Sequence, residues 1–189
     1  TTSDNDLYLY NRETEEMKHI SEHEGSASYS VADFGRDNKT LYILTDEGAE
    51  FTYLKSYNME TGEETTVMES DWDISYAYFS KSGKYRVIGK NEDAKTTISI
   101  TNMETNEEMD LPDFGEINIK GVSISDSETA MRMSVGSSKS PNDLYFYDFD
   151  SNKYNRLTNS LNPEINEDHL VQAEVVRYES FDGTSIPAI

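Results

Sequence analysis

The chain has 189 residues, and its 37 acidic side chains against 16 basic ones give a formal net charge of −21. Hydrophobic residues make up 35% and aromatic residues 11%, enough to bury a core, which excludes a disordered acidic tail. No stretch approaches the ~18 consecutive apolar residues that a membrane helix needs. A surface with this much negative charge repels phosphate groups and anionic lipids. We therefore expect neither a nucleic-acid partner nor a membrane partner.

The sequence contains no cysteine, which excludes disulfides, cysteine-ligated zinc, iron–sulfur clusters and thiol nucleophiles within it. The first residues are polar and lack the basic and then apolar segments of a signal peptide. We expect a cytoplasmic location. An upstream signal peptide stays open, because Thr1 is not an initiating Met.

Four short turn segments share one plan. Each opens with Asn or Asp, whose side chain can accept a hydrogen bond from the backbone two residues further on, and each follows a run of strand-forming residues. Their starts lie 47, 44 and 46 residues apart. The fifth position holds Gly62, Asn106 or Asn152, which tolerate the left-handed backbone of a bulged hairpin, but Glu15 in the first copy predicts a different turn geometry there. The segments are residues 11–16, 58–63, 102–107 and 148–153, opened by Asn11, Asn58, Asn102 and Asp148.

A second turn motif alternates with the first one. Its three copies start 45 residues apart, and strand-like runs flank each copy. Asn38 and Gly83 suit a positive φ in the first two copies, whereas Glu128 does not, so we expect the third copy to be irregular. The copies are residues 34–39, 79–84 and 124–129.

Two hairpins in every ~45 residues give four antiparallel strands per unit, which is typical of a β-propeller blade. A helical period is not sustained over as many as ~11 residues anywhere. A β-sandwich is the alternative, but the phased repetition of two turn types disfavours it. The sequence therefore predicts an all-β fold, a partial β-propeller of about 3.5 four-stranded blades. It comprises an outer hairpin at residues 1–22 and blades at residues 27–69, 72–113 and 117–158.

The repeat stops after the third blade. Residues 159–172 are predicted to form a connector, because their Pro and Asn residues disfavour regular structure. A new strand is predicted over residues 173–181, and Asp182 and Gly183 follow it as a hairpin turn. Residues 173–189 are therefore expected to form a separate hairpin.

These features resemble the prolyl oligopeptidase family of serine peptidases, in particular its acylaminoacyl-peptidase and dipeptidyl-peptidase-like branch. Residues 80–84 (Ser-Lys-Ser-Gly-Lys) match a propeller turn of low specificity, and residues 157–160 (Leu-Thr-Asn-Ser) close the last blade. The hairpin that contains Phe181, Asp182 and Gly183 looks like the first hairpin of the family's α/β-hydrolase domain. The resemblance covers essentially the whole chain. It implies a propeller of about seven or eight blades that covers a hydrolase domain and filters peptides through a central tunnel.

The catalytic motif of that family has no counterpart in this sequence. Gly121 and Gly136 are each followed by serine within two residues, but neither completes a Gly-x-Ser-x-Gly elbow. We assign no catalytic, cofactor-binding or metal-binding residue and expect no cofactor. We expect the chain to be the substrate-gating propeller of a peptidase that hydrolyses short peptides or acyl-peptides, with peptide substrate reached through the parent enzyme. The alternative is a non-catalytic propeller that binds protein or glycan.

Several weaker signals have simpler interpretations. His19 and His23 lie four residues apart, as a metal site on a helix would have them, but no third ligand is evident. Trp72 is expected to pack between blades rather than to line a tunnel mouth. Two pairs of aspartates could direct two carboxylates to one face, as a calcium site would, but turn chemistry is the favoured explanation. The pairs are Asp71 with Asp73 and Asp148 with Asp150.

The acidic excess has two interpretations. It could produce an electronegative tunnel that selects basic substrates, or a solvated surface that keeps the protein dispersed. Many of the glutamates fall in the outer turns, which favours the solvated surface. They are Glu13, Glu15, Glu16, Glu60, Glu63, Glu64, Glu104, Glu107 and Glu108.

We predict self-association, because a partial propeller leaves one blade face uncovered at each open end, and exposed apolar patches of several hundred Å² tend to find partners. Two chains of charge −21 repel each other, so association should strengthen as salt screens that repulsion. Light scattering at micromolar concentration should give a mass above the 21.5 kDa of one chain, rising with added sodium chloride. A single 21.5 kDa species at both low and high salt would contradict this prediction.

Overall fold

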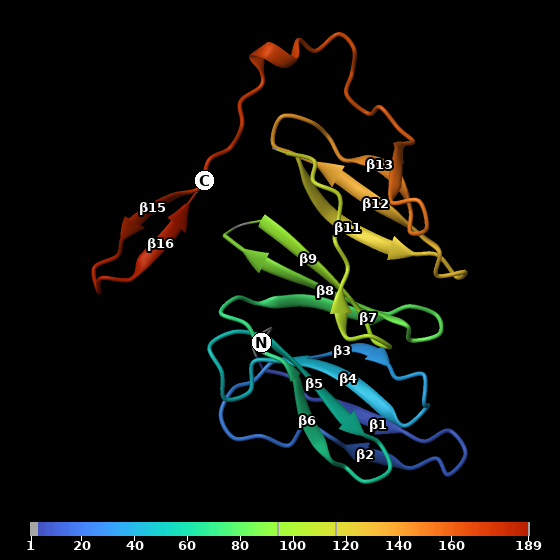
Figure 1. The fold of residues 1–189 in the computed structure, drawn as a ribbon. Helices are drawn as coiled ribbons and strands as arrows, with labels where there is room; N and C mark the ends of the chain where they lie inside the picture. The colour runs from blue at the N-terminus through green and yellow to red at the C-terminus, as the bar shows by residue number, and fades with distance from the viewer. Residues whose placement is uncertain (1–3, 94, 116, 189) are drawn as a thin grey trace.

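The computed structural model describes residues 4–93, 95–115 and 117–188, and in this part of the chain the fold is all-β, as predicted (Figure 1). Three four-stranded antiparallel sheets follow one another along the chain, with a two-stranded hairpin before them and another after them. A single turn of 3-10 helix, η1 (Glu167–His169), interrupts the segment between the third sheet and the last hairpin. In the described part of the chain, no helix has the length and apolar character needed to cross a membrane.

Within each four-stranded sheet, the strands pair in the order of the sequence. The first hairpin consists of β1 (Tyr8–Tyr10) and β2 (Met17–His19). Sheet 1 consists of β3 (Tyr29–Phe34), β4 (Thr40–Thr45), β5 (Tyr53–Asn58) and β6 (Glu64–Met68). Sheet 2 consists of β7 (Ile74–Phe79), β8 (Tyr85–Glu92), β9 (Lys95–Asn102) and β10 (Glu107–Glu108). Sheet 3 consists of β11 (Asn118–Ile124), β12 (Ala130–Gly136), β13 (Asp143–Asp148) and β14 (Lys153–Arg156), and the last hairpin of β15 (Val176–Glu179) and β16 (Ser185–Ala188).

The alternating strand directions give the stack of sheets two distinct ends. The turns after the first and third strands of every sheet lie at one end, which we call the turn end. The turns after the second strands, and the segments that lead from one sheet to the next, lie at the opposite end, which we call the junction end. Figure 1 shows the β15–β16 hairpin at the junction end, beside the turn that joins β8 to β9.

The core consists of apolar side chains between consecutive sheets. Because strand side chains alternate between the two faces, one strand can contribute to two interfaces. In β8, Val87 packs toward sheet 3 together with Met133, whereas the next residue, Ile88, packs toward sheet 1 together with Leu54. These four side chains are at most 1% exposed, and burying each contributes about 1.5–3 kcal/mol.

The first hairpin packs on sheet 1 in the same manner. Leu7 and Leu9 contact a buried cluster that includes Ile20 and Ile43. The hairpin therefore occupies the position of a neighbouring blade, as the outer hairpin of the predicted propeller.

The expectation of a different turn geometry at Glu15 is wrong. Glu15 has a φ of 60°, in the left-handed region, like Gly62 at the same position of the next copy. The amide N–H of Asn11 donates to the carbonyl of Glu16 at 2.8 Å, and the bond between Asn58 and Glu63 has the same length. The hairpin register therefore imposes the left-handed backbone whatever residue stands there.

The expectation that the third copy of the second motif is irregular is also wrong. Glu128 has a φ of 56°, and its amide N–H donates to Ser125 as that of Gly83 donates to Ser80, both at 2.9 Å. The Glu128 carboxylate accepts hydrogen bonds from the amide and hydroxyl groups of Ser82 in the preceding sheet, at 2.7 and 2.6 Å. These contacts offset the strain of a non-glycine residue in this conformation.

The remaining turn residues show the backbone that their types favour. Asn58 Oδ1 accepts from the amides of Glu60 and Thr61 at 2.9 and 3.0 Å, and Asn102 Oδ1 accepts from Glu104 at 2.9 Å. The left-handed positions in the other copies are Asn38 (φ 58°), Gly62 (78°), Gly83 (87°), Asn106 (59°) and Asn152 (53°).

The last hairpin is shorter than the predicted strand over residues 173–181. Strand β15 begins at Val176, because the Ala173 amide donates to the Ser138 hydroxyl at 2.7 Å rather than to a strand partner. The residues that lead into the hairpin are thus attached to sheet 3.

We predict that Glu15→Gly stabilises the protein by about 1 kcal/mol, because glycine adopts a left-handed backbone without the Cβ clash that glutamate suffers. Chemical denaturation should show a higher midpoint for the variant. Glu13→Gly, in the same exposed turn but without a positive φ, is the matched control and should be neutral or destabilising. A lower midpoint for Glu15→Gly than for Glu13→Gly would contradict the prediction.

Candidate functional site

The junction end contains the last hairpin, the exit of the chain from sheet 3 and a cavity, and a partner of the propeller could contact all three. The β15–β16 hairpin lies beside the β8–β9 turn of sheet 2 rather than beside sheet 3, which it follows in sequence (Figure 1). The Arg177 guanidinium pairs with the carboxylate of Asp93, 84 residues earlier, in the turn between β8 and β9. This ion pair joins the hairpin to the propeller at one exposed point.

The predicted hairpin residues Phe181, Asp182 and Gly183 form the turn between β15 and β16. Gly183 has a φ of 85°, and Asp182 Oδ1 accepts from the Thr184 amide at 3.0 Å. This hydrogen bond lowers the pKa of Asp182. Phe181 is fully exposed.

The structure separates the sequence-predicted residues into two groups. The hairpin residues lie at the junction end, whereas the blade turns lie at the turn end, so the two groups do not form one site. The blade-turn residues are Asn58, Gly62, Gly83, Asn102, Asn106 and Asn152. The outer-turn glutamates named above also lie at the turn end, and all of them are exposed.

Asp143, at the start of β13, anchors the exit from the last blade. Its carboxylate accepts hydrogen bonds from the Thr158 hydroxyl at 2.8 Å and the Ser160 amide at 2.9 Å, and it pairs with the Arg156 guanidinium. Burial would raise the pKa of this carboxyl, but the bonds from Thr158, Arg156 and Ser160 outweigh burial and lower the pKa to about 2. Asp143 thus determines where the connector leaves sheet 3.

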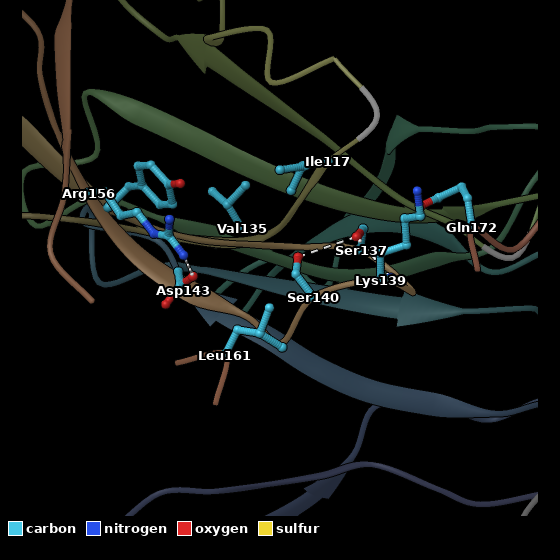
Figure 2. Close-up of a pocket in the computed structure, with 10 residues that line it drawn as sticks. Ile117, Val135, Ser137, Lys139, Ser140, Asp143, Arg156, Leu161 and Gln172 are labelled. Atoms are coloured by element: carbon cyan, nitrogen blue, oxygen red, sulfur yellow. Dashed lines mark hydrogen bonds and ion pairs between the residues drawn. The ribbon is translucent and has the colours of Figure 1, made fainter. Parts of the chain in front are cut away.

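A cavity of about 260 Å³ lies beside Asp143, between sheet 3 and the connector (Figure 2). We call it the junction pocket. Figure 2 shows the Asp143–Arg156 pair at one end of the pocket and Lys139 and Gln172 at the other. Its remaining walls include Ile117, Val135, Ser137, Ser140 and Leu161.

A serine, a histidine and an aspartate also meet near the first hairpin, but not in a catalytic arrangement. The His19 Nε2 atom lies 2.8 Å from Asp6 Oδ1 and 3.4 Å from the Ser21 hydroxyl. A catalytic triad needs different ring nitrogens for the acid and the nucleophile. The Ser21 hydroxyl also accepts from the Leu7 amide at 2.7 Å, and Ser21 is only 3% exposed. The group therefore attaches the chain start to the segment that follows β2.

Both His19 and His23 approach Asp6 Oδ1, at 2.8 Å from His19 Nε2 and 3.7 Å from His23 Nδ1. The His23 ring contacts the Ser21 carbonyl through Nδ1 at 2.8 Å and Asp4 through Nε2 at 3.1 Å, and these two contacts raise its pKa. Within residues 4–93, 95–115 and 117–188, no group of three His, Cys, Asp or Glu residues could hold a metal ion.

One aspartate of each pair accepts a hydrogen bond from a backbone amide. Asp73 Oδ1 accepts from the Thr52 amide at 2.9 Å, and Asp148 Oδ1 accepts from the Ser151 amide at 2.9 Å. The Trp72 ring lies 6.5 Å from that of Phe51, in the loop between β4 and β5. Trp72 thus lies near the loop between β4 and β5 of the preceding sheet.

Two features of the junction end escaped the sequence analysis. The first is the Asp143 anchor. The sequence did indicate its Thr158 and Ser160 side, since residues 157–160 mark the end of the last blade. Asp143 itself lies 15 residues before Thr158, and nothing in its surroundings distinguishes it from other strand-edge aspartates. The junction pocket gave no signal, because its walls come from separate segments of the chain.

We predict that Asp143→Asn lowers the free energy of unfolding by about 2 kcal/mol at pH 7. The folded-state pKa of about 2 lies below the ordinary value of 3.8 for an aspartate, so the stabilisation is present above pH 4 and is lost as the pH falls from 4 to 2. Denaturant titrations of both proteins across this range should show the stability difference shrinking with falling pH. Asp150→Asn, in the exposed turn after β13, should change stability little at any pH. A difference that does not depend on pH would contradict the role given to the charge.

Comparison with solved structures identifies the same fold elsewhere. A chain from a structural and mechanistic analysis of two prolyl endopeptidases has 19% identity and a TM-score of 0.74, with 98% of this chain and 27% of that chain covered. Prolyl oligopeptidase B from Galerina marginata, bound to a 25mer macrocyclization substrate, has 18% identity, a TM-score of 0.74 and the same coverage. TolB from Acinetobacter baumannii has 15% identity and a TM-score of 0.60, with 81% of this chain and 37% of that chain covered. At these identities the likeness shows the fold alone.

The first of these matches also shows that the present chain spans about a quarter of the length of the prolyl endopeptidase it resembles. No curated protein matches the sequence. The family model for the N-terminal β-propeller domain of prolyl oligopeptidase matches residues 1–160, which comprise the first hairpin and all three sheets. The resemblance to this family is thereby confirmed, and the chain belongs to the prolyl oligopeptidase N-terminal β-propeller family.

Proposed function

We propose that this chain is the substrate-gating propeller segment of a serine peptidase that hydrolyses short peptides or acyl-peptides, and that it is not catalytic by itself. The observation that carries the proposal is the family match over residues 1–160, followed by a hairpin that resembles the start of a hydrolase domain. We assign the parent to the acylaminoacyl-peptidase and dipeptidyl-peptidase-like branch, in the cytoplasm, with peptide as its partner and with neither nucleic acid nor membrane.

The arrangement of the first strands supports a gating role. Strands β3, β7 and β11 each form a free edge of their sheet, and in a closed propeller such edges surround the central channel. On β3, Val31 and Phe34 are about half exposed (48% and 51%). A narrow channel bounded by packed sheets excludes folded proteins by size and admits short, extended peptides.

The β15–β16 hairpin supports the presence of a further domain. Its pairs Val176–Ala188 and Tyr178–Ile186 place apolar side chains on one face of the hairpin. Val176 and Tyr178 are 56% and 57% exposed. A two-stranded hairpin is marginally stable in water, so further strands over this face would account for its apolar sequence.

Self-association through the open faces remains part of the proposal. At one end of the stack Tyr8, Tyr10 and Met17 are exposed on the first hairpin, and at the other end Leu144 and Phe146 are exposed on β13. These are the two faces that neighbouring blades would cover in a closed ring.

We predict that a fluorophosphonate probe, which phosphonylates activated serines with loss of fluoride, labels the full-length gene product but not the 189-residue chain. The reason is that this chain has no Gly-x-Ser-x-Gly elbow and no cysteine to replace it. Chromogenic acyl-amino-acid and dipeptide substrates should be cleaved only by the full-length protein. Turnover by the 189-residue chain that survives repurification would refute the non-catalytic assignment. A full-length protein that is neither labelled nor active would instead favour a propeller that binds protein or glycan.

A further inference from the structure

The junction pocket is enclosed by two parts of the chain that are separate in sequence. Val135 lies on β12 of sheet 3 and Ile117 directly precedes β11, whereas Leu161 and Gln172 belong to the connector. Its volume of about 260 Å³ lies just below the ~300–1,000 Å³ of typical small-molecule sites, so it suits a ligand about the size of one amino-acid residue.

The pocket has one cation available to a ligand. The guanidinium of Arg156 is already used, because it pairs with Asp143 and donates to the Thr158 carbonyl and to Asn159 Oδ1, both at 2.8 Å. Lys139 lies at the opposite end of the pocket (Figure 2). Its ammonium group forms no ion pair with any of the residues that the structure describes. The Debye length is about 8 Å at physiological salt, so a nearby ammonium outweighs the more distant charges of the acidic surface. An anionic group is therefore favoured at the Lys139 end.

The same end of the pocket offers an unused acceptor. Gln172 Oε1 is buried and has no hydrogen-bond partner among the described residues. Such atoms are rare, because a buried acceptor without a partner has lost its hydrogen bonds to water and has gained none from the protein. Rotation of the Gln172 side-chain amide toward the pocket would bring this atom within reach of a ligand, and a ligand N–H would then satisfy it.

We propose that the junction pocket binds a small aliphatic carboxylate that carries an amide N–H, which is the chemistry of an N-acylated amino acid and of a peptide C-terminus. The carboxylate pairs with Lys139, the amide donates to Gln172 Oε1, and the aliphatic side chain contacts Ile117, Val135 and Leu161. This inference goes beyond the proposed function, because binding needs neither the missing catalytic residues nor any turnover.

Binding would also connect two segments that hold the last hairpin in place. Lys139 lies between β12 and β13, whereas Gln172 precedes Ala173, whose amide donates to Ser138 at 2.7 Å. A ligand that contacts both Lys139 and Gln172 adds a second connection beside this hydrogen bond. Occupancy should therefore slow hydrogen exchange of the connector amides.

The test is a titration of the ¹⁵N-labelled 189-residue chain with N-acetyl-leucine, followed by amide shifts. A ligand of this size should bind with a Kd of about 1 mM, with the shifts centred on residues 137–140 and 172. N-acetyl-leucine amide, which lacks the carboxylate, and 4-methylpentanoate, which lacks the N–H, should each bind at least about fivefold more weakly.

Two variants and a longer ligand complete the test. Lys139→Gln should weaken N-acetyl-leucine at least about fivefold but leave its amide unaffected, whereas Lys153→Gln, at the turn end of sheet 3, should change neither. Gln172→Leu should weaken N-acetyl-leucine without lowering the melting temperature, because it removes the unpaired acceptor. A tetrapeptide ending in leucine that binds as well as N-acetyl-leucine identifies peptide C-termini as the ligand, and one that binds much more weakly identifies the free acylated amino acid.

The proposal is overturned if N-acetyl-leucine gives no saturable shifts up to about 20 mM, well above the expected Kd. It is equally overturned if the acid and its amide bind alike, or if Lys139→Gln and Lys153→Gln have the same effect. None of these results bears on whether the parent protein is a serine peptidase, because that is decided by the probe labelling of the full-length protein.

Discussion

The fold depends on sheets that carry apolar side chains on both faces. A two-layered sandwich buries one face of each sheet, so its strands alternate between apolar and polar residues. Here Val87 and Ile88 follow each other in β8 and are both buried, because one faces sheet 3 and the other faces sheet 1. This requirement for two apolar faces makes the sheets stack in sequence order, and it leaves the two outermost faces uncovered.

Polar contacts at the turn end hold consecutive sheets in register. Asp33 accepts from the Phe79 amide at 2.8 Å, and Arg36 donates to the Phe79 carbonyl at 2.7 Å. Side chains of sheet 1 are thus hydrogen-bonded to the backbone of sheet 2. Glu128 makes the corresponding connection between sheets 3 and 2 through Ser82. Apolar packing is non-directional, whereas these charge-assisted bonds have a defined geometry, so they set how far one sheet can slide on the next.

The sequence was sufficient for the fold because the repeat is local. The hairpins were identified by the Asn and Asp residues that open their turns and by the regular spacing of those turns along the chain. Within each sheet, every strand pairs with its neighbour in the chain. Residue type alone failed at Glu15 and Glu128, because hairpin register and, at Glu128, a contact with Ser82 override the intrinsic backbone preference. The junction pocket and the Asp143 anchor could not be derived in this way, since both depend on where the connector runs after the repeat has ended.

The ion pair between Arg177 and Asp93 has a consequence for the order of folding. Each sheet is a contiguous stretch of chain, so hairpins form early and a growing chain can add one sheet at a time to the previous one. Asp93 emerges 84 residues before Arg177, and its partner is missing until sheet 3 and the connector are complete. The hairpin can therefore contact the β8–β9 turn only after sheet 3 and the connector have been made.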